Sequence, residues 1–127
     1  MVTTDSTATP DEQDQWIVEA VEALPGGSVG YKPEWDSWLL LVADKVFGMR
    51  STHAEWGDIL TLKGNPAENE ALRQEFDAVV PGYYANKQHW NSVLLDRAQV
   101  PRERVIEMMA ESHRLVVAKL PKAARPT

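Results

Sequence analysis

The order of the periodic patterns along the chain constrains its fold more than any other feature of the sequence. Apolar residues recur at helical spacing near both ends, over about residues 10–24 and from Pro101 to about Lys119. Most of the β-favouring segments between them follow one another directly, and such neighbours pair antiparallel across tight turns. The pattern therefore predicts an α+β fold, in which the terminal helices pack against an antiparallel sheet of about five strands.

Turn residues set the expected bounds of the elements between the two terminal helices. A short helix from Pro66 to about Phe76, with Asn65 as its N-cap, is expected to precede the last strand. Asp44 and Lys45 are expected to form a tight hairpin turn, and residues 51–57 a loop. The expected strands cover residues 28–32, 38–43, 46–50, 59–63 and 90–95. The expected buried stripe of the last helix is Val105, Ile106, Met109, His113, Val116, Val117 and Leu120.

The length of 127 residues fits one domain, which we place at residues 10–121. Residues 1–9 are expected to form a disordered tail, and residues 122–127 a basic tail. The chain has no cysteine, which excludes disulfides and thiolate metal sites. Its amino terminus lacks a signal-peptide pattern, and no apolar run approaches the roughly 20 residues of a membrane helix. We therefore expect a cytoplasmic protein without membrane contact.

The segment at residues 81–90, PGYYANKQHW, is the most distinctive motif of the chain. It resembles the signature of the MmcQ/YjbR family, in which a proline, a short spacer and Asn-Lys-x-His-Trp precede a strand. Further segments resemble the family's elements in the same order, at residues 24–26, 44–47, 60–63 and 115–121. The resemblance covers about residues 13–122 and implies a CyaY-like, double-wing α+β fold. It also implies DNA binding as a candidate function, although that association rests on the fold alone.

Residues within and near this motif are the candidate ligand-binding residues. Lys87 would contact a phosphate, while Asn86 and His89 would hydrogen-bond a polar ligand. Trp90 would stack on a base or pack beneath the site. The structural alternative is that Asn86 holds a turn and the indole ring fills the core. Three basic residues on neighbouring expected strands would either join Lys87 in one patch or remain scattered solubilising charges: Lys45, Arg50 and Lys63.

The net charge of −6 weighs against nucleic acid and in favour of a different partner class. We therefore carry two hypotheses, nucleic-acid binding at the motif and a protein- or small-molecule-binding module without nucleic-acid contact. A weaker alternative is frataxin-like metal binding by the acidic residues of the first helix. The structural alternative is that these residues simply form a solvated helix face.

No catalytic chemistry is indicated by the sequence. It contains no nucleophile elbow, phosphate-binding loop or dinucleotide fingerprint, so we expect neither enzymatic activity nor a cofactor. His53, His89 and His113 lack the spacing of a zinc site, and His113 is expected to be a hydrogen-bonded core or boundary residue. We expect a monomer.

Overall fold

A computed structural model describes residues 14–82 and 86–126 of the chain. The expected N-terminal tail and the first turn of the expected first helix lie outside the described residues. The helices and strands are α1 (Gln15–Glu22), β1 (Gly27–Lys32), β2 (Ser37–Val42), β3 (Lys45–His53), β4 (Gly57–Lys63), α2 (Pro66–Glu75), β5 (Val79–Pro81), β6 (Trp90–Leu94) and α3 (Arg102–Ala118). Short 3-10 turns cover Pro33–Trp35, Leu95–Arg97 and Lys122–Ala124.

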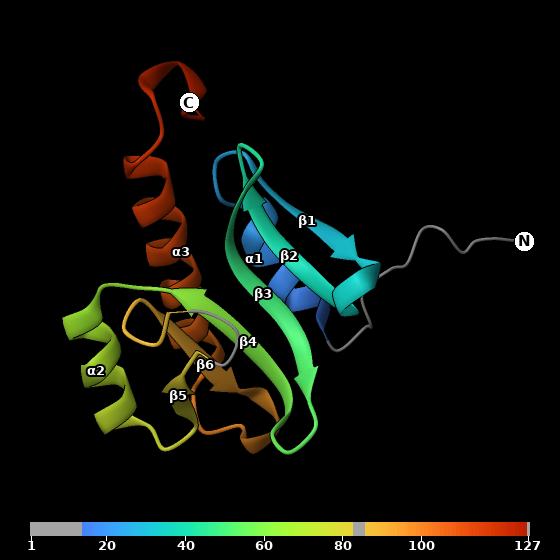
Figure 1. The fold of residues 1–127 in the computed structure, drawn as a ribbon, viewed down its shortest axis with the longest axis vertical. Helices are drawn as coiled ribbons and strands as arrows, with labels where there is room; N and C mark the ends of the chain where they lie inside the picture. Colours follow the sequence, from blue (N-terminus) through green and yellow to red (C-terminus); the bar gives the residue numbers. More distant parts are fainter. Residues whose placement is uncertain (1–13, 83–85, 127) are drawn as a thin grey trace, which may run out of the picture.

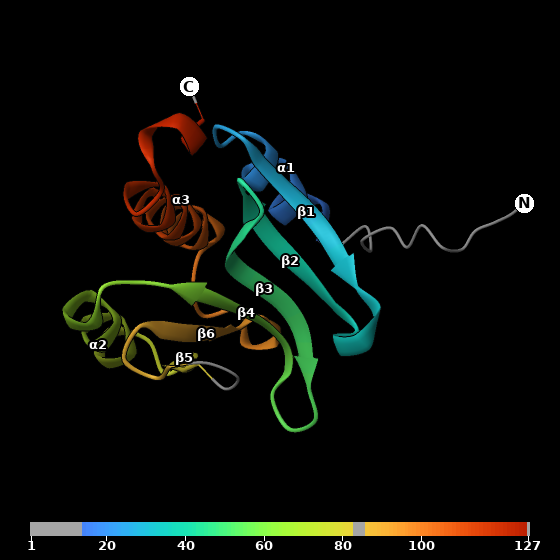
Figure 2. The same ribbon diagram turned by 45° about the horizontal axis from the view of Figure 1, so that its top comes forward.

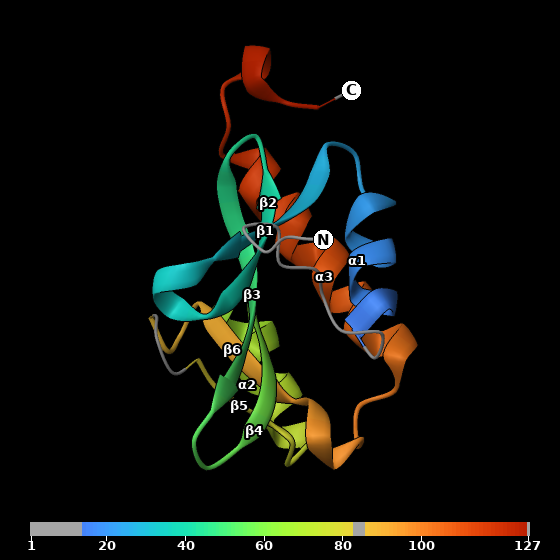
Figure 3. The ribbon, with the colours of Figure 1, turned by 90° about the vertical axis from the view of Figure 1, so that its right-hand side faces the viewer.

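The described strands form one antiparallel sheet in the order β1-β2-β3-β4-β6-β5 (Figure 1). The expected α+β class is confirmed, with one strand more than the expected number. Figure 3 shows β1 to β3 nearly edge-on, with α1 and α3 on the same side of them. In Figure 2, which looks nearly along α3, the sheet twists around this helix so that β1–β3 and β4–β6–β5 form two wings.

The core lies between the sheet and the helices that cover it. Its sheet side chains include Leu40, Phe47 and Leu60, and α1 adds Ile17 and Val21. Helix α3 contributes the buried residues Val105, Met109, Ser112, His113 and Val116. These five positions follow a narrow helical stripe, which explains why the expected core residue Ile106 is instead 41% exposed on the flank of the helix.

The turn between β2 and β3 differs by one residue from the expected one. Val42 pairs with Lys45, so the turn consists of Ala43 and Asp44 rather than Asp44 and Lys45. Both turn residues adopt left-handed backbone conformations, with φ of 49° and 64°. Two consecutive positive φ values match the twist of a tight hairpin, which is why the turn closes here without glycine.

Two further segments differ from the expectation. The end of β3 is a strand where a loop was expected, and β5 was not expected at all. Strand β3 continues through Ser51 to His53, because Thr52 pairs with Asp58 and its hydroxyl donates to the Asp58 carboxylate at 3.1 Å. Strand β5 is only three residues long and ends at Pro81, so its sequence carries almost no alternation from which to recognise it.

Candidate functional site

The turn before β6 positions most of the candidate residues of the motif. The Asn86 side-chain oxygen accepts hydrogen bonds from the backbone N–H groups of Gln88 at 2.9 Å and His89 at 3.2 Å. Asn86 therefore holds the turn with its side chain, which is the structural role considered for it as an alternative to ligand binding. Gly64 donates its backbone N–H to the His89 carbonyl at 2.8 Å, and the Asn69 amide donates to the Gln88 carbonyl at 3.1 Å. This anchoring leaves the side chains of Lys87 and His89 exposed.

Trp90 begins β6 directly opposite Lys63, the last residue of β4. The indole ring is half-buried, and the Lys63 ammonium lies 5.6 Å from the ring centre. The pKa of Lys63 is lowered from its ordinary value, first because the side chain is partly buried and second because the like charge of Lys119 lies nearby. Helix α3 passes beside the end of β4, because the hydroxyl of Ser112 on α3 donates to the Lys63 carbonyl.

We call Lys63, Lys119 and the exposed side chains of Lys87 and His89 the lysine face. Among the residues that the structure describes, none of the three lysines forms an ion pair with a carboxylate. Lys63 ends β4 and Lys119 follows the end of α3, while Lys87 and His89 lie on the turn that leads into β6, the strand paired with β4. This arrangement favours an anion.

Two other candidate residues stand apart from the lysine face. Arg50 is only 7% exposed, and its guanidinium contacts the carboxylates of Asp14 at 3.1 Å and Asp58 at 3.0 Å. It joins α1 to the β3–β4 pair and presents no charge to a ligand. Lys45 is exposed at the start of β3, next to the β2–β3 turn and toward the same end of the sheet as Lys63, because Gly48 pairs with Leu62.

The described histidines other than His89 have structural contacts. His53 accepts hydrogen bonds on Nδ1 from the backbone N–H groups of Glu55 and Trp56, and its ring stacks on Trp56 at 4.2 Å. The buried His113 donates from Nε2 to the Pro25 carbonyl at 2.7 Å and meets the Phe47 ring edge-on. Across residues 14–82 and 86–126, no three histidine, aspartate or glutamate side chains converge as a metal-binding group.

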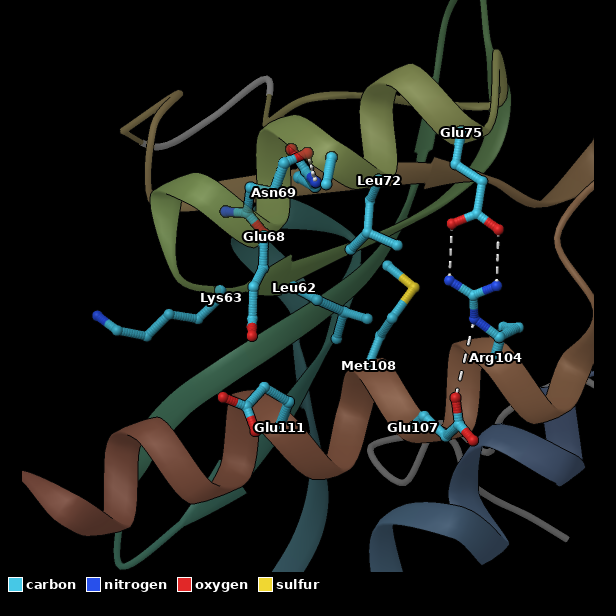
Figure 4. Close-up of a pocket in the computed structure, with 13 residues that line it drawn as sticks. Leu62, Lys63, Glu68, Asn69, Leu72, Glu75, Arg104, Glu107, Met108 and Glu111 are labelled. Atoms are coloured by element: carbon cyan, nitrogen blue, oxygen red, sulfur yellow. Dashed lines mark hydrogen bonds and ion pairs between the residues drawn. The ribbon is translucent and has the colours of Figure 1, made fainter.

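A groove between α2 and α3 is a second candidate site that sequence reasoning missed. It has a volume of about 380 Å³ and lies over the end of β4 (Figure 4). Leu62, Leu72 and Met108 supply apolar surface, whereas glutamates from both helices line its sides. Each helix looks like an ordinary solvated acidic face in sequence, so only their packing against each other creates the groove.

A second cavity, of about 360 Å³, adjoins the buried ion pairs of Arg50. Trp16 lines this cavity together with Arg102, whose guanidinium lies 5.0 Å from the indole centre. The neighbouring Asp96 carboxylate accepts a hydrogen bond from the backbone N–H of Asp58 at 3.1 Å. These contacts fasten the segment before α3 to the sheet and to α1.

Comparison with known proteins gives one family. The family model described as YjbR matches residues 22–115. The uncharacterized protein YjbR of Escherichia coli K12 is 30% identical over 109 residues, which cover 86% of this chain and 91% of that protein. The uncharacterized protein YyaQ of Bacillus subtilis is 30% identical over 82 residues, covering 65% of this chain and 66% of that protein.

Solved structures agree with this assignment. A Deinococcus radiodurans protein with a domain of family DUF419 superposes with a TM-score of 0.75 and 27% identity, covering 85% of this chain and 81% of the other. A Pseudomonas syringae protein superposes with a TM-score of 0.68 over 84% of this chain and 98% of its own, at 18% identity, and shows the fold alone. Within the described part of the chain, no helix is long and apolar enough to cross a membrane.

Proposed function

Because this chain belongs to the YjbR family, whose matched relatives are named as uncharacterized proteins, we propose its function from its own surface: it is a non-catalytic protein that binds nucleic acid through phosphate contacts at the lysine face. The observation that carries this proposal is that Lys63, Lys87 and Lys119 form no ion pair with any described carboxylate, while burial and the like charge of Lys119 lower the pKa of Lys63. Like charges held close together raise the free energy of the unliganded protein, and a bound anion lowers it.

The exposed part of the motif supplies the remaining contacts. Lys87 projects from a turn whose backbone is fixed by Asn86, so its ammonium reaches a phosphate without disturbing the fold. His89 lies on the same turn, and the half-buried Trp90 follows it in sequence with the Lys63 ammonium over its ring. A polymer with evenly spaced phosphates suits an open surface of this kind better than a compact ligand, which requires an enclosing cavity.

The overall charge of −6 sets the expected strength of this binding. With few cations facing the ligand and an acidic protein behind them, affinity depends on about three phosphate contacts rather than on a broad positive field. For double-stranded DNA each contact contributes about 0.9 to the slope of log affinity against log salt. Three contacts give a slope of about −2.7, so the affinity is expected to fall about 40-fold between 50 and 200 mM salt.

The test is fluorescence anisotropy of labelled single- and double-stranded oligonucleotides at several salt concentrations. The variants Lys63→Gln, Lys87→Gln and Lys119→Gln should each weaken binding and reduce the slope by about 0.9 for duplex DNA. Lys32→Gln is the matched control, because Lys32 lies on β1 with its ammonium 4.0 Å from Glu34 and makes the same change in net charge. Binding that does not depend on salt, or that Lys32→Gln weakens equally, would refute the proposal.

A further inference from the structure

The two edges of the sheet differ in how they are protected against pairing with another strand. At one edge, β5 is only three residues long and ends at Pro81, which has no backbone N–H to donate. At the other edge, β1 is six residues long, contains no proline and pairs with β2 without a bulge. Its one charged residue is Lys32, at its end. Strand β1 therefore lacks the usual protection of a sheet edge (Figure 1).

The direction of the backbone groups on β1 follows from the pairing of the next two strands. The two-residue turn between β2 and β3 requires Val42 and Lys45 to exchange both of their backbone hydrogen bonds. Val42 therefore directs its backbone groups away from β1, and its partner Gly27 directs its own away from β2. The Gly27 N–H accordingly donates to the Leu24 carbonyl, at 2.9 Å. Gly27 thus marks the outward-facing positions of β1.

Val29 and Tyr31 carry the outward-facing backbone groups farther along β1, because these positions alternate along an antiparallel strand. No residue within 14–82 and 86–126 forms a hydrogen bond with these outward groups. Val29 lies opposite the buried Leu40, so both side chains of this pair and that of Tyr31 point to the face that the helices cover. The free edge of β1 can therefore accept another strand without disturbing the core.

We propose that β1 pairs antiparallel with β1 of a second copy of the chain, with the two-fold axis at Gly30. In this register Val29 lies opposite Tyr31 of the second copy, and each such pair exchanges both backbone hydrogen bonds. Both pairs also place a β-branched side chain beside an aromatic ring, which is a favourable cross-strand combination. One continuous sheet then spans both copies. This assembly differs from the monomer expected from the sequence.

The residues of β1 complement one another in this register. At the axis, Gly30 lies opposite Gly30 of the second copy, so no side chains collide there. A methyl group added to Gly30 would lie 3.3 Å from Cδ1 of Leu41, so each copy also brings an apolar side chain close to the axis. Lys32 lies opposite Ser28 of the second copy, so no like charges oppose each other along the paired strands. These contacts meet the requirement of a symmetric, self-complementary interface.

The exposed Trp35 favours a second copy over an unrelated strand. It lies in the β1–β2 connection and is 59% exposed, more than any other large apolar side chain in the described residues. Since Lys32 lies opposite Ser28, the connection that follows Lys32 extends toward the exposed Pro25 of the second copy. The indole ring packs there against the turn that precedes β1. Strands β2 and β3 separate this interface from β4, so the inference does not depend on nucleic-acid binding.

Sedimentation equilibrium of the full chain over a range of concentrations tests the dimer. The mass should rise from the chain mass of 14.2 kDa toward twice that value, because a pair of strand edges gives a small, reversible interface. Val29→Pro removes an outward N–H but no bond to β2, so it should weaken dimerisation at least about tenfold. Val29→Thr keeps that N–H and the branched shape, and it should dimerise like the wild type. Trp35→Ser, at an exposed position, should weaken dimerisation about tenfold.

Disulfide trapping tests the register, since the chain has no cysteine of its own. Residues 28 and 32 of opposite copies form a close pair, with Cα atoms about 4.5 Å apart, which is within disulfide range. A mixture of Ser28→Cys and Lys32→Cys chains should therefore crosslink faster than either variant alone.

Three results would overturn the proposal. A mass of 14.2 kDa at every concentration excludes the dimer and leaves the edge of β1 to a different protein. Dimerisation that folded Val29→Pro and Trp35→Ser chains retain in full places the interface elsewhere. Crosslinking that is no faster in the mixture than in either variant alone refutes the register. Thermal unfolding shows that each variant is folded, and none of these results bears on the lysine face.

Discussion

Replacing Arg50 by methionine should destabilise the protein more than any change to a surface ion pair. The Arg50 side chain is 8% exposed, and its partners Asp14 and Asp58 are 12% and 25% exposed. Methionine keeps the aliphatic stem of the residue, but it removes the guanidinium that contacts both carboxylates. Removing one member of a buried ion pair costs about 3–5 kcal/mol. Because Asp58 keeps some contact with water, we expect a value near the lower end, about 3 kcal/mol.

Urea unfolding followed by tryptophan fluorescence measures this loss. For an m value of about 2 kcal/mol/M, a loss of 3 kcal/mol lowers the midpoint by about 1.5 M. The double variant Arg50→Met with Asp14→Asn should recover part of the loss, because one uncompensated charge is removed. The matched control is Arg104→Met, which breaks an exposed bidentate pair with Glu75 and should shift the midpoint far less. Similar midpoints for Arg50→Met and Arg104→Met would refute the reasoning.

Three further predictions concern the turn, the sheet and pH. Ala43→Gly should stabilise the protein by about 0.5–1 kcal/mol in urea unfolding, because glycine tolerates the φ of 49° better than alanine; a destabilised variant would contradict this. Gly48→Ala should cost about 1–3 kcal/mol, since the new methyl would lie 2.8 Å from Leu62 and 2.9 Å from Leu40; no change in midpoint would contradict it. The stability advantage of the wild type over Glu75→Gln should be fully present above the ordinary carboxyl pKa of 4.5 and disappear as the pH falls through the lowered pKa of Glu75; an advantage that grows on acidification would contradict it.

Local sequence signals predicted the elements well where the structure depends on nearby residues. Asn65 caps α2 as expected, with its side-chain oxygen 2.9 Å from the backbone nitrogen of Ala67. Helix α3 begins just after Pro101, and β6 begins at Trp90. In each case a cap, a proline or the start of an apolar run marks the boundary within the sequence itself.

Contacts between distant segments could not be predicted from the same patterns. Arg50 looked like a surface cation, yet Asp14, which lies 36 residues earlier, neutralises it in the core. Ser112 can be buried because the Lys63 and Met108 carbonyls both lie within reach of its single O–H donor, and a polar residue in a helix gives no sign of such partners. The groove between α2 and α3 likewise arises only when the two helices pack side by side, because neither helix alone carries a pattern that indicates it.

The most direct test of nucleic-acid binding is to map backbone amide shifts on adding an oligonucleotide at low salt. We predict that the shifts concentrate at the end of β4, the 86–90 turn and the end of α3, which together carry Lys63, Lys87 and Lys119. They should disappear at high salt as phosphate contacts are lost. Shifts confined to other surfaces, such as the exposed Trp35 of the β1–β2 connection, or no shifts at all from the folded protein, would contradict the account.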